Sequence, residues 1–102
     1  MQEVIGRRIL RVKNRESEEV GECVVEILQP FTVHPDSVSF AVDEQSAGCE
    51  VRITGLGDNF TETIYGADSI QALQLSSDID SLLRRFEGKY EFYFVDGSPY
   101  FE

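Results

Sequence analysis

Hydrophobic and polar residues alternate over the first part of the chain, and this alternation predicts two antiparallel β-strands at residues 4–13 and 21–29. If Val12 lies opposite Cys23, the apolar residues of both strands share one face of the sheet and most charged residues share the other. Arg8 is an exception, because this register places it on the inner, apolar face. The pattern therefore predicts a hairpin with one buried face.

A run of basic residues lies in this hairpin: five of the nine Lys and Arg residues fall between Arg7 and Arg15. Acidic residues follow at Glu16, Glu18, Glu19, Glu22 and Glu26. In the predicted register Lys13 faces Glu22, so opposite charges meet across the outer face. We interpret the basic run as half of a hairpin that neutralises its own charge, and a nucleic-acid-binding arm is the alternative.

Alternation continues further along the chain and predicts a second hairpin, with strands at residues 38–42 and 49–53. A glycine-containing turn then leads into a strand at residues 60–65. Pairing Ile53 with Ile64 gives reasonable cross-strand neighbours on the outer face. The first two-thirds of the chain is therefore expected to be β-structure.

One long α-helix of about five turns is predicted after these strands. Asp68 is a candidate N-cap with Gln71 three residues later, and Gly88 is a candidate end signal. The apolar stripe at helical spacing consists of Ala72, Leu75, Ile79, Leu82, Leu83 and Phe86. A helix with this stripe is able to cover one face of a twisted sheet.

The order of elements predicts a single α+β domain over residues 1–102. The expected architecture is a mainly antiparallel sheet of about six strands, built from hairpins, with the long helix packed on one face. A strand at residues 90–95 and the turn at residues 96–99 complete the sheet, as a C-terminal strand or hairpin.

The chain is acidic, with nineteen Asp and Glu residues and a net charge of −10. Residues 1–15 carry five bases and one acid, a charge of +4, so residues 16–102 carry −14. Such a surface repels phosphate backbones and anionic membranes and favours a basic protein partner. We therefore expect no nucleic-acid ligand and no membrane association.

The residues that carry chemistry are few and scattered. Cys23 and Cys49 sit within alternating segments, which favours buried thiols; a disulfide between them is the alternative. His34 is the only histidine, and adjacency to Asp36 and Ser37 in sequence does not make a catalytic triad. We expect no catalytic set, no metal site and no cofactor, in a protein located in the cytoplasm.

Five residues are candidates for binding a partner or a ligand. Arg8 and Glu62 are both predicted on the inner face, where a charge needs a partner or access to water, and they would pair if their strands were close. Tyr93 and Tyr100 belong to an aromatic C-terminal segment that could form an exposed patch, although most of its rings are expected to pack against the helix. Tyr65 is the third polar group, with Arg8 and Glu62, for a cavity between helix and sheet.

The segment from Gly66 to Leu73, with the sequence GADSIQAL, resembles a motif in a family of small uncharacterised bacterial domains. The resemblance extends to an early strand with Arg7 or Arg8 and to a cysteine-containing strand that ends at Gly55. The family usually continues its helix with small residues, whereas this chain has two serines and an aspartate at 76–78. The resemblance implies an intracellular bacterial protein and supplies no functional residues.

These features favour a non-enzymatic protein-interaction module, comparable to an immunity or adaptor protein. A small-molecule-binding domain with its site between helix and sheet is the alternative. The expected state is a monomer or a homodimer formed through an exposed edge strand.

Overall fold

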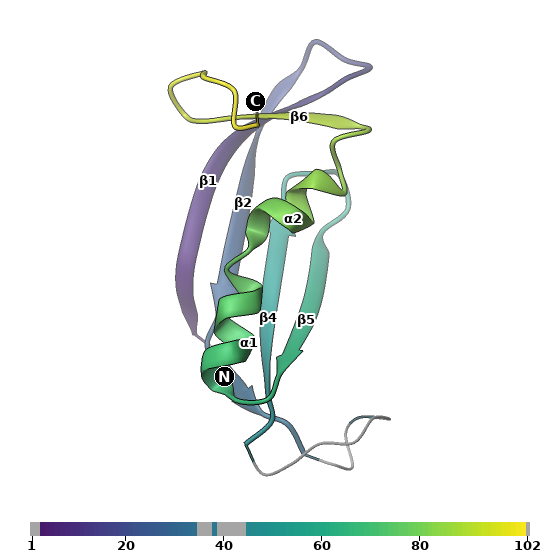
Figure 1. Ribbon diagram of the computed structural model, residues 1–102. Helices are drawn as coiled ribbons and strands as arrows, with labels where there is room; N and C mark the ends of the chain where they lie inside the picture. The colour runs from purple at the N-terminus through teal and green to yellow at the C-terminus, as the bar shows by residue number, and fades with distance from the viewer. Residues whose placement is uncertain (1–2, 35–37, 39–44, 102) are drawn as a thin grey trace.

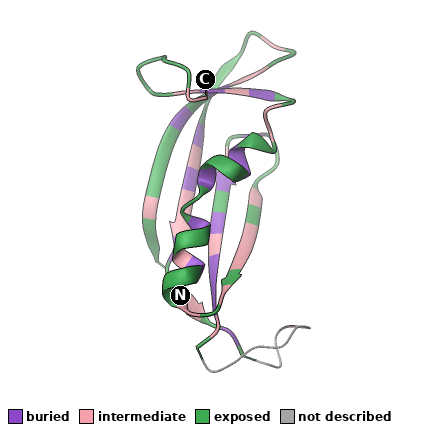
Figure 2. Ribbon diagram, in the orientation of Figure 1, coloured by how far each residue is buried: buried purple, intermediate pink, exposed green. Residues whose placement is uncertain are grey.

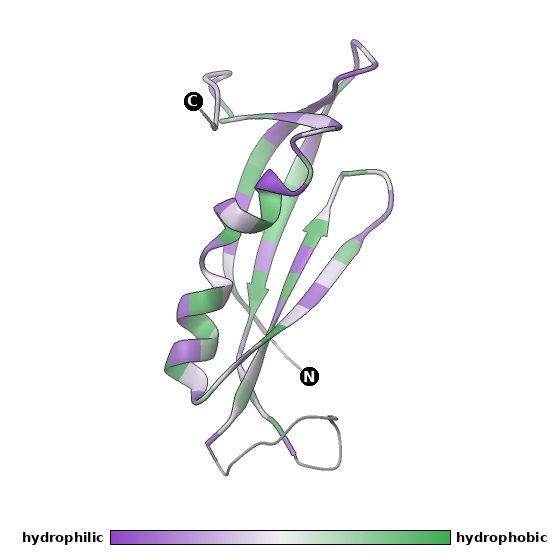
Figure 3. Cartoon of the chain, turned by 45° about the vertical axis from the view of Figure 1, so that its right-hand side comes forward, coloured by the Kyte–Doolittle hydropathy of each residue, from purple (hydrophilic) through white to green (hydrophobic). Residues whose placement is uncertain are grey.

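The computed structural model describes residues 3–34, 38 and 45–101 and is an antiparallel β-sheet with two helices on one face (Figures 1 and 3). The elements, in chain order, are β1 (Val4–Asn14), β2 (Val20–Leu28), β3 (Phe31–Thr32), β4 (Ala47–Thr54), β5 (Phe60–Gly66), α1 (Ser69–Ser76), α2 (Ile79–Arg84) and β6 (Tyr90–Tyr93). The predicted α+β class and a mainly antiparallel sheet of six strands are confirmed.

Strand β4 lies at the centre of one half of the sheet. It pairs with β5 on one side and with β2 and the short β3 on the other, while β1 joins β2 to β6. The sheet curls, so that β6 runs across its end in Figure 1. Residues 39–42 of the predicted second hairpin lie outside the described residues.

The β1–β2 hairpin forms as predicted, but the predicted register is wrong by two residues. Cys23 lies opposite Leu10, and Val12 lies opposite Gly21. A two-residue slip keeps every side chain on its predicted face, so the alternation cannot exclude it. The turn selects the register: the Asn14 carbonyl accepts a hydrogen bond from the N–H of Ser17 at 3.0 Å, which keeps the connection short.

The β4–β5 register differs from the predicted one by four residues, because Ile53 pairs with Phe60 and not with Ile64. The turn at residues 55–59 is tight, so pairing of the two strands begins close to it, with Ile53 opposite Phe60. Gly55 has a φ of 99°, and a Cβ atom there would lie 2.0 Å from the Glu22 carbonyl oxygen. This turn thus needs glycine both for its backbone angle and for its close contact with β2.

The predicted single long helix is wrong, because the chain breaks between α1 and α2 at Ser77 and Asp78. The Ser77 hydroxyl donates to the Gln74 carbonyl, and Asp78 caps α2 by accepting hydrogen bonds from Ser81. Serine and aspartate compete in this way with helical backbone bonds. Leu75 of the predicted stripe is consequently half exposed, while Ser76 is fully buried.

The start of α1 agrees with the prediction. Asp68 accepts a hydrogen bond from the Gln71 N–H at 2.8 Å, and the Gln71 side chain accepts one from the Ala67 N–H at 2.6 Å. Gly66 lets the helix approach β5, because a Cβ there would lie 2.4 Å from the Ala72 nitrogen. The segment from Gly66 to Leu73 is therefore a strand-to-helix connection under steric constraint.

The hydrophobic core fills the space between the helices and the inner face of the sheet (Figure 2). Its main cluster of buried residues is Leu10, Val12, Cys23, Val25, Val51, Ile53, Leu56, Ile79, Leu82, Leu83, Tyr90 and Phe92. Helix α2 supplies three of these side chains, so it anchors the layer of helices to the sheet.

Candidate functional site

A cleft of about 260 Å³ opens beside Arg8, between β1, β2 and the junction of the two helices. Its lining consists of Gly6, Arg7, Arg8, Val25, Ile27, Ser77 and Ile79. Ser77 and Ile79, at the junction of the two helices, form one of its walls. Its lining combines apolar side chains of β2 and α2 with the guanidinium of Arg8, so apolar surface lies beside a positive charge.

Arg8 has an unusual environment for an arginine on the inner face. Its Nη1 donates a hydrogen bond to the Tyr100 hydroxyl at 2.6 Å, and Tyr100 in turn donates to a carboxylate oxygen of Asp80. Within the described part of the chain, Arg8 forms no ion pair with a carboxylate. Burial, followed by the hydrogen bond to Asp80, raises the pKa of Tyr100 above its ordinary value.

The other two residues predicted for a cavity with Arg8 lie elsewhere. Glu62 and Tyr65 are on β5, which is separated from β1 by β4 and β2. Glu62 forms an ion pair at 3.2 Å with Arg85, the C-cap of α2, and not with Arg8. Tyr65 is on the opposite face of β5 from Glu62, since the two residues are three positions apart. The structure therefore does not bring Arg8, Glu62 and Tyr65 together.

The outer face of the sheet has no helix over it within the described residues (Figure 3). Opposite charges do face each other here, but the predicted pair of Lys13 with Glu22 is wrong, because Lys13 lies opposite Val20. Instead Arg7 contacts Glu26 at 2.6 Å, and Arg11 lies opposite Glu22. Between these two charged rows Ile9 lies opposite Val24. The outer face thus carries an apolar row between rows whose charges balance.

Three exposed aliphatic side chains lie around the Arg11–Glu22 pair on this outer face. Ile9, Val20 and Val95 are 44%, 61% and 56% exposed, and all three line a hollow of about 300 Å³. Leu10, Arg11, Gly21 and Glu22 complete its lining. Exposed apolar side chains that gather around a concavity are typical of a contact surface. We call Ile9, Val20 and Val95 the outer apolar patch; its members come from three separate segments, and sequence reasoning missed it.

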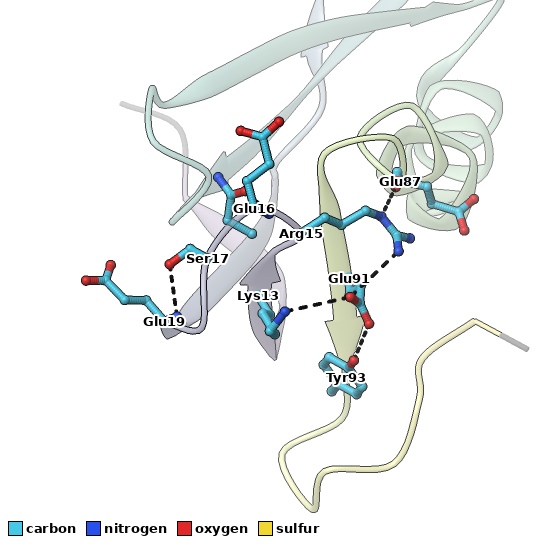
Figure 4. A network of polar contacts seen from close by, with 9 residues as sticks. Lys13, Arg15, Glu16, Ser17, Glu19, Glu87, Glu91 and Tyr93 are labelled. Atoms are coloured by element: carbon cyan, nitrogen blue, oxygen red, sulfur yellow. Dashed lines mark hydrogen bonds and ion pairs between the residues drawn. The ribbon is translucent and has the colours of Figure 1, made fainter.

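Tyr93 belongs to a polar network at the turn end of the hairpin (Figure 4). Its hydroxyl donates to Glu91, which also attracts Lys13 and Arg15 at 4.0 and 3.7 Å. The Tyr93 hydrogen bond lowers the pKa of Glu91 and raises that of Tyr93 itself. Arg15 also donates to the carbonyl oxygen of Glu87 at 2.6 Å, so the network ties β1 and β6 to the end of the helices.

The aromatic C-terminal segment is used mainly for packing. Tyr90 and Phe92 are buried. The guanidinium of Arg84 lies over the ring of Phe101, with 4.3 Å from its Cζ atom to the ring centroid. Tyr100 packs against Phe101 and Phe94. The expectation that most of these rings pack is therefore supported, and Phe94 is the ring left 43% exposed.

Both cysteines are buried free thiols, as predicted. Burial raises the pKa of Cys23 to about 11, so at neutral pH it is the protonated and unreactive form. The Cys49 thiol contacts the Leu28 carbonyl at 3.1 Å. The strand register places Cys23 near the turn after β4, roughly 20 Å along the sheet from Cys49. A disulfide between them is thus geometrically impossible.

The described residues also bear on the predictions for catalysis, metal binding and membrane association. His34 is exposed, and its neighbours Asp36 and Ser37 lie outside the described part of the chain. Over the described ranges, no three His, Cys, Asp or Glu side chains are placed to hold a metal ion together. Neither of the two helices has the length and apolar character needed to cross a bilayer.

Comparisons of the chain with protein-family models, with curated proteins and with solved structures found no match. The two candidate surfaces therefore rest on the chemistry and geometry of this molecule: the cleft beside Arg8 and the outer apolar patch.

Proposed function

We propose that the protein is a non-enzymatic interaction module, of the immunity or adaptor kind, and that it binds a partner through the outer apolar patch. The observation that carries this proposal is that Ile9, Val20 and Val95, all exposed, line one hollow of the outer face together with Arg11 and Glu22. Burial of such side chains against a partner is favourable by roughly 25 cal/mol for each Å² of apolar surface removed from water.

Charge indicates the kind of partner. The chain carries −10 overall, and the two charged residues in the lining of the hollow, Arg11 and Glu22, lie opposite each other and balance in charge. The field of the remaining acidic residues attracts a positively charged protein and accelerates its association. A basic protein with a small apolar protrusion fits both the charge of the molecule and the hollow.

Native mass spectrometry of the tagged protein, purified gently from its own organism, tests this function. We expect a second protein at fixed stoichiometry, which is lost from Val20→Asp because a carboxylate in the hollow would have to be desolvated on binding. Ile70→Asp is the matched control, since Ile70 is 68% exposed on α1, away from the patch. Retention of the partner by Val20→Asp contradicts the proposal.

The cleft beside Arg8 favours a second candidate, a small-molecule-binding domain. Its support is the arginine with no carboxylate partner among the described residues, at the mouth of a cleft lined by Val25, Ile27 and Ile79. The same mass spectra separate the candidates: a small adduct of constant mass on an otherwise bare chain supports ligand binding, and a bound protein supports the interaction module.

A further inference from the structure

The two edges of the sheet differ in how their backbone groups are used. At the β6 edge the chain turns back, so that Tyr93 bridges to Pro99 and the N–H of Tyr100 donates to the Phe92 carbonyl at 3.0 Å. At the other edge, β5 pairs only with β4 within the described residues. Every second residue of β5 therefore directs its N–H and C=O groups away from the sheet.

Strand β5 has few of the features that normally prevent edge strands from pairing; the inward-facing charge of Glu62, opposite the buried Val51, is one that it does have. Its sequence, FTETIYG, contains no Lys and no Pro, and it follows β4 for seven residue pairs without a bulge. Its only charged residue is Glu62, which forms a partly exposed ion pair with Arg85 at 3.2 Å. A continuous, locally neutral edge of this length is a template for another strand.

We propose that β5 is a dimerisation edge, at which a second copy of this chain pairs antiparallel about a two-fold axis at Thr63. This register uses the whole strand. Across the interface, Thr63 of one copy lies opposite Thr63 of the other, and the remaining pairs between the copies are Thr61 with Tyr65, Glu62 with Ile64 and Phe60 with Gly66. Threonine pairs and aromatic pairs with β-branched residues are favourable across strands. An axis at Glu62 would instead set two carboxylates against each other.

The occupant is a second copy because the strand is complementary to itself. The dimer leaves the outer apolar patch open, because that patch lies on β1, β2 and the segment after β6. Each copy carries −10, so long-range repulsion opposes association at low ionic strength. Salt screens such repulsion over about 8 Å at physiological ionic strength. Dimerisation is therefore expected to strengthen as salt is added.

Sedimentation velocity of the full chain over a range of concentrations tests the dimer. We expect the monomer to be replaced by a dimer as concentration rises, at lower concentration in 0.5 M than in about 0.05 M NaCl. Thr63→Lys is expected to abolish the dimer, because it sets two ammonium groups together at the axis, while in the monomer residue 63 lies opposite Glu50 and the fold is kept. Thr54→Lys, on the same face of the interior strand β4, is the matched control.

Oxidative cross-linking tests the register. Thr63→Cys should form an intermolecular disulfide, because residues opposite each other in an antiparallel pair have Cα atoms about 4.5–5.5 Å apart. Thr61→Cys should not, because its counterpart is displaced by four residues, roughly 13 Å. The native thiols are buried and do not interfere.

A wild-type chain that stays monomeric at every concentration and salt level overturns the proposal, and so does equal cross-linking of the two cysteine variants. A dimer that survives Thr63→Lys overturns it as well, since it would use another interface. Binding of the partner protein is measured separately with Val20→Asp, so failure of the dimer and failure of the proposed function are distinguishable.

Discussion

At the scale of single residues, the buried hydroxyl of Ser76 is the least satisfied group in the described part of the molecule. Its side chain is fully buried, and its Oγ has no hydrogen-bond partner. A buried hydroxyl without a partner costs about 1–3 kcal/mol. Ser76 occupies this position because the helix break turns Leu75 outward and the following residue inward.

Ser76→Ala is therefore expected to stabilise the protein by about 1 kcal/mol, since it removes the unpaired hydroxyl and alanine favours helix more than serine does. The measurement is the free energy of unfolding from urea denaturation. Ser77→Ala is the control: that exposed hydroxyl bonds the Gln74 carbonyl, so its loss should change stability by less than about 0.5 kcal/mol. A destabilised Ser76→Ala variant would indicate that the hydroxyl has a role in the fold.

At the scale of elements, the junction between the helices determines where the apolar side chains of α2 point. Asp78 accepts hydrogen bonds from the N–H and the hydroxyl of Ser81, at 3.4 and 2.6 Å. This cap starts a new helix and directs Ile79, Leu82 and Leu83 into the core. Residues of the same junction also line the cleft beside Arg8.

Asp78→Ala is expected to lower the free energy of unfolding by about 1 kcal/mol, as is usual when an N-cap is lost. Denaturant titrations at neutral pH measure the loss. Asp58→Ala provides the comparison, because Asp58 is an exposed acid in the turn after β4 and its replacement should have little effect. Unchanged or increased stability in Asp78→Ala would mean that α1 and α2 fuse into the single helix that the apolar stripe predicts.

The hydrophobic patterns of the sequence determine some features of the fold and leave others open. Alternation specifies the face of each residue, so it correctly places Val12 and Cys23 in the core and Lys13 on the outer face. It does not fix register, which depends on the turns at Asn14 and Gly55. The apolar stripe also did not reveal the break between the helices. Ile79 is at helical spacing from the apolar residues before the break and from those after it, so the pattern is the same for one helix and for two.

The candidate site was less predictable, because it depends on segments far apart in the chain. Arg8 was singled out from its position on an apolar face, and it does line a cleft. Its contact with Tyr100 and the placement of Ile9, Val20 and Val95 around one hollow depend on the sheet order and on the path of the C-terminal segment. Neither is encoded in any local pattern.

At the scale of the whole molecule, polar contacts hold an elongated body together. The molecule measures 48 × 27 × 23 Å. In a body of this shape, single side chains that contact several elements help to hold those elements together. Tyr100 is one of these side chains: it accepts a hydrogen bond from Arg8 of β1 and donates one to Asp80 of α2. A single hydroxyl thereby connects the first strand, the second helix and the C-terminal segment.

Tyr100→Phe keeps the ring and removes this bridge, and we expect the free energy of unfolding at pH 8 to fall by about 1 kcal/mol. The effect should depend on pH. Burial and Asp80 raise the pKa of Tyr100 in the folded protein, so the neutral phenol stabilises the fold below the ordinary tyrosine pKa of about 10, and this contribution is lost as pH rises through the raised value.

Urea denaturation of the wild type and of Tyr100→Phe between about pH 8 and pH 11 measures both parts of this prediction. The difference in stability should narrow above about pH 10, because the wild type alone loses the contribution of this phenol. A difference that stays constant with pH would show that the phenol does not titrate differently in the folded and unfolded chain. In that case the three segments would be joined by ring packing of Tyr100 on Phe94 and Phe101 and not by its hydroxyl.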